Sequence, residues 1–143
     1  MPNFAQSFPY KVIIEVAFRD LDAMGHVNNA VYLSYMETAR IKFLVDLLAV
    51  TSLHDLPVIM AEATCTFKAP AFFGELLTVG VGVSRFGSKS FDMAYQIDAG
   101  DGRLIALGRT VQVMYDYAAA QTIVMPEAFK AKILTFQGAW QAP

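Results

Sequence analysis

The fold is decided by residues 32–48, which read YLSYMETARIKFLVDLL. At 100° per residue, five side chains fall on one narrow face of a helix: Tyr32, Met36, Ala39, Phe43 and Leu47. The opposite side is only partly polar, because Ile41, Val45 and Leu48 lie there among hydrophilic residues. A helix on a protein surface would keep that side hydrophilic. We therefore expect a long helix that is largely enclosed, with other parts of the protein wrapped around it or packed behind it.

Strand patterns lie on both sides of this helix. Before it, residues 10–19 alternate between apolar and more polar side chains, which predicts a strand with one buried face. After it, four further strands are predicted, over residues 58–68, 76–86, 89–98 and 103–116. Pro126 then opens a short helix to about residue 136. Consecutive strands with short turns predict an α+β fold, in which an antiparallel sheet of about five strands wraps around one long central helix.

Length and composition limit the possibilities. The 143 residues fit a single domain over residues 1–143. Hydrophobic residues make up 55% of the chain, above the usual ~45–50%. The longest stretch without a formal charge, residues 23–36, contains His26, Asn28, Asn29 and Ser34, so it does not predict a membrane span. The excess instead predicts an enclosed helix together with a second copy at the open sheet edges.

The cysteine and histidine content and the net charge exclude further classes of protein. Cys65 is the one cysteine, so no intrachain disulfide forms, and with His26 and His54 as the only histidines a Cys/His zinc site lacks ligands. No signal peptide is visible, which favours a cytoplasmic protein. The net charge of −2 argues against nucleic acid as a general partner.

The segment of residues 20–29, DLDAMGHVNN, joins the first strand to the long helix. A helix begins with unpaired backbone N–H groups and a partial positive charge, which bind an anion or polarise a carbonyl. Of Asp20 and Asp22, one is free to hold the loop while the other faces a cleft as a nucleophile or general base. From spacing alone, the alternative that these residues only cap and turn the chain is equally good.

Residues 18–40, FRDLDAMGHVNNAVYLSYMETAR, resemble the signature of hot dog-fold acyl-CoA thioesterases, in particular the 4-hydroxybenzoyl-CoA thioesterase-like family. Weaker likeness extends to residues 87–91 and to the Met-Pro-Glu sequence at 125–127. The resemblance implies an antiparallel sheet wrapped around one long helix, in agreement with the periodicity. It also implies homodimers with joined sheets, and often homotetramers.

The same resemblance assigns the chemistry. It implies hydrolysis of an acyl-CoA to free acid and coenzyme A, with Asp22 as the catalytic carboxylate and the backbone N–H of Asn29 as the oxyanion donor. No separate cofactor or metal is implied, because coenzyme A is part of the substrate. Further residues are expected to bind the substrate: Gly25, His26, Asn28, Tyr32 and Thr66. Residues around one hairpin turn are expected to bind coenzyme A: Arg85, Lys89 and Ser90.

Other readings of these residues stay open. Asn28 also suits an N-cap, and Tyr32 suits the core. We expect Glu37 to pair with Arg40, although some relatives place a catalytic acid on this helix. Cys65 is expected to be a buried small residue. An aromatic group in the second strand and beyond is assigned to core or interface, with an acyl pocket as the alternative: Phe67, Phe72 and Phe73.

Two other functions compete with hydrolysis. A hot dog hydratase or dehydratase would pair Asp22 with a histidine, and His26 lies four residues away. A non-catalytic acyl-CoA-binding protein is the second alternative. The sequence leaves open the acyl group, the choice between a nucleophilic and a general-base role for Asp22, and the choice between dimer and tetramer.

Overall fold

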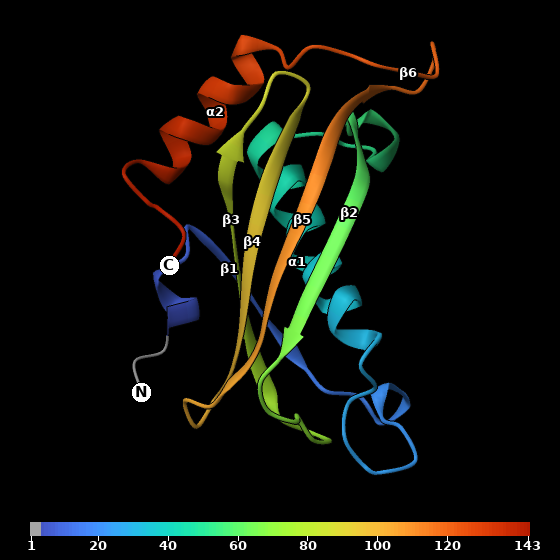
Figure 1. The fold of residues 1–143 in the computed structure, drawn as a ribbon, viewed down its shortest axis with the longest axis vertical. Coiled ribbons are helices and arrows are strands. Elements are labelled where there is room, and N and C mark those ends of the chain that lie inside the picture. Colours follow the sequence, from blue (N-terminus) through green and yellow to red (C-terminus); the bar gives the residue numbers. More distant parts are fainter. Residues whose placement is uncertain (1–3) are drawn as a thin grey trace.

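The structure, a computed structural model, describes residues 4–143. One antiparallel sheet is formed by β1 Tyr10–Glu15, β2 Val58–Phe67, β3 Leu76–Phe86, β4 Ser90–Ala99 and β5 Leu104–Asp116, with the short β6 Gln121–Thr122 beside β5. The helices are α1 Val31–Leu48 and α2 Glu127–Gln137, with single 3₁₀ turns η1 Phe4–Ser7, η2 Phe18–Asp20 and η3 Leu53–Asp55. The strand order is β1-β3-β4-β5-β2, so β2 pairs with β5 and not with β3, the next strand along the chain (Figure 1). The predicted α+β class and the antiparallel sheet are confirmed.

The first strand is shorter than predicted. It ends at Glu15, whereas alternation continued to residue 19. The Val16 N–H then donates to Glu75 O at 2.9 Å, and the chain turns into η2. As a result Phe18, which alternation placed on the buried face, is 78% exposed. A local turn has overridden the period-two pattern at this point.

Helix α1 packs against one face of the curled sheet, behind the strands in Figure 1. Four members of the predicted apolar face, Tyr32, Met36, Ala39 and Phe43, are buried, and Leu47 is partly buried. The opposite side is enclosed only in part: Ile41, Val45 and Leu48, on which the expectation of a largely enclosed helix rested, are partly buried against the core. That side carries Leu33 at 38% exposure and a set of exposed polar residues: Ser34, Glu37, Thr38 and Lys42.

The other face of β3 is covered by the two ends of the described chain. A Cβ at Gly80 would lie 2.8 Å from the Ala5 carbonyl oxygen, and one at Gly82 would lie 2.6 Å from Trp140. Glycine is required at both positions because another segment approaches closely. Beyond the end of β1, the Gln137 side chain bonds both the N–H and the C=O of Val83, which closes the free edge of β3.

Strand β2 forms the opposite border of the sheet and pairs with β5 along one side only (Figure 1). Its ten residues include Ile59, Met60 and Phe67, which are each at least 40% exposed. A long edge with exposed apolar side chains is a template for pairing with another strand. Within residues 4–143, the structure contains no helix with the length and apolar character needed to cross a bilayer.

Candidate active site

The loop between β1 and α1 is held by Asp20. Its Oδ2 accepts hydrogen bonds from the Ala17 N–H at 3.0 Å and from the Tyr35 hydroxyl at 2.7 Å. Tyr35 lies on the buried face of α1, so this contact ties the loop to the helix. Burial and the hydrogen bond to Asp20 raise the pKa of Tyr35, which keeps its hydroxyl protonated as the donor. Asp20 is therefore the carboxylate that holds the loop, which leaves Asp22 for another role.

Asp22 lies in a tight turn that closes on itself. Its N–H donates to His26 O at 2.9 Å, and the Gly25 N–H donates to Asp22 O at 3.1 Å. Gly25 adopts a φ of +86°, and a Cβ there would meet no atom within 4 Å. The glycine is needed for this backbone conformation and not for a close approach. Its role as a direct substrate contact stays a prediction.

The Asp22 carboxylate has two distinct contacts. Oδ1 accepts the Met24 N–H at 2.9 Å, and Oδ2 lies 3.3 Å from His26 Nδ1. The Asp22 side chain is 20% exposed, and that of His26 is 30% exposed. His26 Nδ1 also lies 3.4 Å from Val27 O. The turn therefore presents a partly shielded carboxylate next to an imidazole, an arrangement that suits proton transfer or nucleophilic attack.

The start of α1 provides a free donor beside this turn. Asn28 Oδ1 accepts the Ala30 N–H at 3.0 Å, and Asn28 O accepts the Val31 N–H at 2.9 Å. Asn28 thus closes the turn that leads into the helix, in the manner of a capping residue, although the N-cap position itself is Ala30. Within residues 4–143, the Asn29 N–H has no protein acceptor. Such a donor at a helix N-terminus can stabilise a developing oxyanion.

A cavity of about 240 Å³ opens next to Asn29. Its lining comes from the loop, α1 and the segment after β2: His26, Val27, Asn29, Tyr32, Phe67, Lys68, Ala69 and Pro70. Tyr32 is buried, its hydroxyl oxygen accepts the Ala71 N–H at 3.3 Å, and burial raises its pKa. Tyr32 therefore packs in the core and also lines the cavity, and its contact with substrate stays a prediction. Asp22 is not among the lining residues and meets the cavity through His26.

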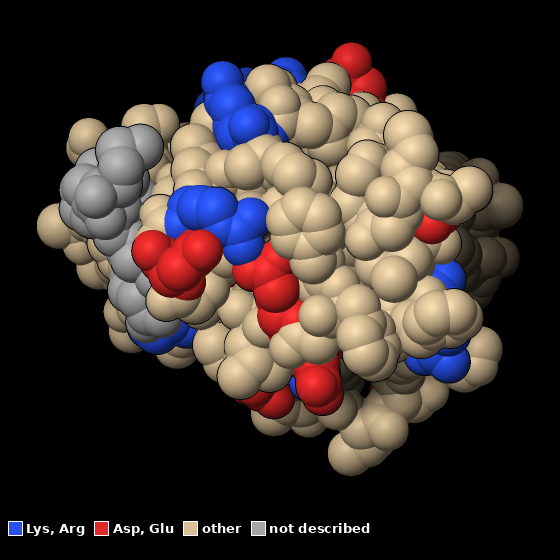
Figure 2. Space-filling view, turned by 90° about the horizontal axis from the view of Figure 1, so that it is seen from below, with Lys and Arg blue, Asp and Glu red and all other residues tan. Residues whose placement is uncertain are grey.

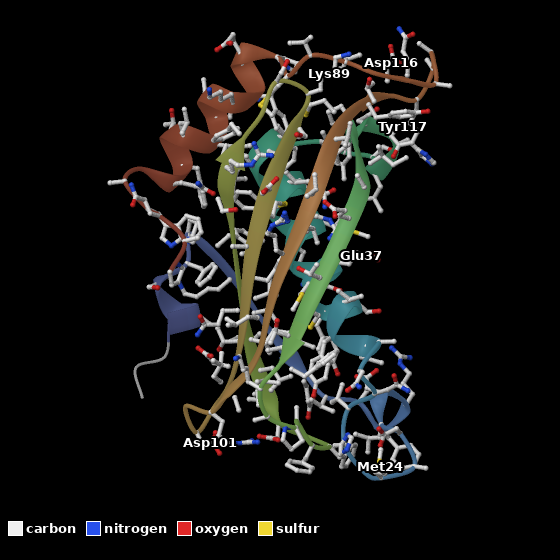
Figure 3. All side chains as sticks on the ribbon, in the orientation of Figure 1. Met24, Glu37, Lys89, Asp101, Asp116 and Tyr117 are labelled. Atoms are coloured by element: carbon white, nitrogen blue, oxygen red, sulfur yellow. The ribbon has the colours of Figure 1, made fainter. Side chains whose placement is uncertain are left out.

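The predicted coenzyme A residues lie elsewhere in the same chain. Lys89 and Met24, a neighbour of Asp22, mark opposite ends of the molecule in Figure 3. Arg85 binds Asp92 through Nε at 3.2 Å and Nη2 at 3.3 Å, which leaves it engaged on the sheet. Ser90 begins β4 beside the same turn. One chain thus brings the predicted loop and helix residues together, whereas Arg85, Lys89 and Ser90 lie away from them.

Cations near the cavity itself are few. Figure 2 views this end of the molecule, where most of the surface is uncharged and acidic groups lie beside basic ones. Arg103 is already paired with Asp101 at 2.8 Å and with Glu75. Lys68 lines the cavity and is exposed, so it is the cation placed to meet a phosphate there. Lys68 is not among the coenzyme A-binding residues predicted above, because nothing in its sequence pattern distinguishes it from a surface lysine.

The other residues named from the sequence have different outcomes in the structure. Glu37 and Arg40 form the expected pair, with Oε2 and Nη2 3.6 Å apart. Thr66 is exposed on β2, one residue before the cavity. Cys65 is only partly buried, and desolvation raises the pKa of its thiol, which argues against a nucleophile.

The aromatic group predicted for core or interface is not in the core of one chain. The side chains of Phe67, Phe72 and Phe73 are 47%, 45% and 63% exposed. Phe67 lines the cavity, and the interface assignment stays a prediction. Among residues 4–143, no three His, Cys, Asp or Glu side chains group closely enough to hold a metal ion.

The fold has counterparts among known proteins. A thioesterase from Thermus thermophilus, solved with coenzyme A and Zn, is 34% identical, with a TM-score of 0.84 over 92% of this chain and 96% of that one. A thioesterase superfamily member from Jannaschia sp. CCS1 is 29% identical, with a TM-score of 0.80 over 94% of this chain and 87% of that one. The BH1999 gentisyl-coenzyme A thioesterase is 27% identical, with a TM-score of 0.76 over 86% of this chain and 98% of that one.

The family model of the thioesterase-like superfamily matches residues 16–133, which include the loop, α1 and most of the sheet. The chain therefore belongs to the thioesterase-like superfamily. The predicted resemblance to hot dog-fold thioesterases, and with it the predicted enzyme class, is confirmed.

Proposed function

We propose that this protein hydrolyses an acyl-CoA thioester to the free acid and coenzyme A, with the Asp22 carboxylate as nucleophile or general base. The observation that carries the proposal is the juxtaposition of this carboxylate, next to His26, with the free Asn29 N–H at the start of α1. One group supplies the attack and the other stabilises the oxyanion that attack creates. The names of the thioesterase relatives support a coenzyme A thioester as the substrate.

In this proposal the reaction consists of attack on the thioester carbonyl, followed by departure of coenzyme A. The thioester carbonyl lies with its oxygen toward the Asn29 N–H, and Asp22 either attacks the carbonyl carbon or removes a proton from an attacking water. In the general-base route the C–S bond then breaks, and the thiolate of coenzyme A leaves with the proton that Asp22 took from the water. In the nucleophilic route the C–S bond breaks to leave a mixed anhydride of Asp22 and the acyl group, and water hydrolyses it to the free acid and the regenerated carboxylate, while the thiolate takes a proton from that water. His26, within 3.3 Å of the carboxylate, positions Asp22 and lines the cavity. No step is assigned to a metal ion or to a separate cofactor.

We further propose that the functional unit is a homodimer joined through β2. Antiparallel pairing of two β2 strands places the Val58 end of one strand beside the Phe67 end of the other. Within one chain, Lys89 lies at the Val58 end, because its carbonyl accepts the N–H of Met114, which pairs with Val58. The second copy would thereby bring its Lys89 turn toward the cavity beside Phe67. In such a dimer, the residues predicted to bind coenzyme A, which lie far from Asp22 in their own chain, would serve the active site of the other chain.

The test is release of free thiol from a panel of short, long, branched and aromatic acyl-CoAs. We expect thiol release from at least one class, at a rate that depends on the acyl group. Binding of the panel without turnover would contradict the proposal and favour an acyl-CoA-binding protein. Loss of an enoyl double bond without thiol release would favour a hydratase. Sedimentation equilibrium at micromolar concentration tests the dimer, and a stable monomer would contradict it.

A further inference from the structure

Arg40 is a buried cation between α1 and the sheet. It is 6% exposed, and its Nη1 donates to the Tyr95 hydroxyl at 3.3 Å. The Tyr95 hydroxyl lies 2.8 Å from Thr110 Oγ1, which also accepts from Gln112 Nε2 at 3.0 Å. All three sheet residues are themselves buried. The polar groups of the sheet are thus bonded to one another and accept only one N–H of the guanidinium.

The other guanidinium N–H groups are without an acceptor among residues 4–143. The nearest carboxylate, that of Glu37, is 3.6 Å from Nη2, beyond hydrogen-bond length, and its side chain is 64% exposed. A guanidinium carries several N–H donors in a fixed plane, and a buried donor without an acceptor destabilises the fold. Something outside the described chain is therefore expected to accept from Arg40.

A cavity of about 90 Å³ adjoins these donors. It is lined by α1, β2 and one residue of β5: Leu33, Ser34, Met36, Glu37, Arg40, Met60, Ala63 and Thr110. The cavity beside Asn29 is likewise walled by α1 and the end of β2, through Tyr32 and Phe67. In Figure 3, Glu37 lies partway along the molecule from Met24 toward Tyr117. The two cavities therefore follow one another along the crevice between α1 and β2.

We propose that this second cavity, called here the Arg40 cavity, receives the far end of the substrate's acyl group, and that this end carries an oxygen substituent that accepts hydrogen bonds from Arg40. The inference rests on the proposed thioester hydrolysis. Helical side chains point back toward the N-terminus, so the guanidinium lies near the level of residue 37. From Asn29 that is eight residues, or about 12 Å along the helix axis. With carbon–carbon bonds of about 1.5 Å, a spacer of roughly six to ten carbons fits.

The oxygen substituent is a hydroxyl or a carboxylate, and the effect of Glu37 on binding distinguishes these two alternatives. A hydroxyl would accept from Arg40 and donate to Glu37, so it would profit from both partners. A carboxylate would bind Arg40 in a two-pronged manner but would repel Glu37. Replacing Glu37 by Gln should therefore raise kcat/KM for the carboxylate substrate and leave the hydroxyl substrate unchanged or slower.

The experiment compares kcat/KM for thiol release from three acyl-CoAs of equal length: octanoyl, ω-hydroxyoctanoyl and suberyl, which ends in a carboxylate. The series is repeated at chain lengths of six and ten carbons. We expect one oxygenated substrate to exceed its alkyl counterpart by about 10- to 100-fold, the range for a hydrogen bond to a charged group. Arg40→Met should abolish this ratio while octanoyl-CoA turnover persists, which also shows that the variant is folded.

The control is Lys42→Met, which removes an exposed cation from the same helix and should leave the ratio unchanged. Where Arg40→Met fails to give a cooperative melt, Arg40→Lys replaces it and should lower the ratio, because lysine lacks the planar fork. Equal rates for alkyl and oxygenated substrates at every length would overturn the inference but not the hydrolysis. Absence of thiol release from all substrates would instead overturn the proposed function.

A partner's carboxylate is the competing acceptor for Arg40. In that case Arg40→Met would dissociate the dimer in sedimentation and leave the substrate ratio unchanged. This outcome would overturn the inference.

Discussion

Replacing Asp20 by Ala tests the division of labour between the two loop carboxylates. The change removes the acceptor for the Tyr35 hydroxyl and for the Ala17 N–H. Tyr35 is 6% exposed, so its orphaned hydroxyl costs about 1–3 kcal/mol, whereas the backbone N–H regains water at a net loss of about 1 kcal/mol. The free energy of unfolding should therefore fall by about 2–4 kcal/mol.

The assay is urea unfolding at neutral pH, with all variants at one protein concentration because association would add to the apparent stability. Tyr35→Phe alone should cost about 1 kcal/mol, since Asp20 keeps its second donor. The double variant should cost less than the sum of the single ones, which measures the coupling of this pair. Asp22→Ala is the matched control and should cost less than about 1 kcal/mol, because the groups that it frees, the Met24 N–H and the His26 ring, both reach solvent.

An Asp20→Ala variant that is no less stable than Asp22→Ala would refute the role of Asp20 in holding the loop. Strictly additive losses of stability in the double variant would refute it as well. Either result would mean that the Tyr35 contact does not hold the loop on the helix.

Two further predictions concern packing and pH. Gly80→Ala should lower the free energy of unfolding by about 1–3 kcal/mol, because the new methyl group would overlap the backbone of η1. The control is Gly100→Ala, where the new Cβ would lie 3.8 Å from the Leu76 carbonyl oxygen. Equal melting temperatures for the two variants would contradict this prediction. The Tyr10 hydroxyl donates to Asp46, and burial, then this bond, raises the pKa of Tyr10 to about 12 from its ordinary value of 10. Because the folded pKa is the higher one, this stabilisation is complete below pH 10 and disappears as pH rises through about 12. Between pH 10 and about 12, the free energy of unfolding of Tyr10→Phe should fall less than that of the parent. Parallel curves of unfolding free energy against pH for the two proteins would contradict this prediction.

The sequence predicted the long helix and the boundaries of most strands because periodicity is a local property. The apolar face of α1 and the alternation of β3 needed no knowledge of distant residues. Where a turn took precedence, prediction failed, as at Phe18, whose exposure follows from the hydrogen bonds of η2. The position of β2 also escaped prediction, since strand order depends on pairing between segments that are far apart in the chain.

The candidate site was predictable in part for the same reason. The motif of residues 20–29 is contiguous, so the turns around Asp22 and at Asn28 followed from local spacing and resemblance. The cavity was not predictable, because Lys68 and Pro70 reach it from the segment after β2. Arg40 was assigned only an ion pair with Glu37. Its burial depends on contact with Tyr95, which lies 55 residues later in the chain.

The central claim is that the Asp22 carboxylate performs the hydrolysis. The direct measurement is kcat for thiol release by Asp22→Asn, compared with the parent on the same acyl-CoA, after circular dichroism and melting show that both are folded. Asparagine keeps the shape and removes the charge, so kcat should fall by about 10²- to 10⁴-fold, the usual contribution of a positioned acid–base group. Thiol release at the parent rate by a folded Asp22→Asn variant would contradict the claim.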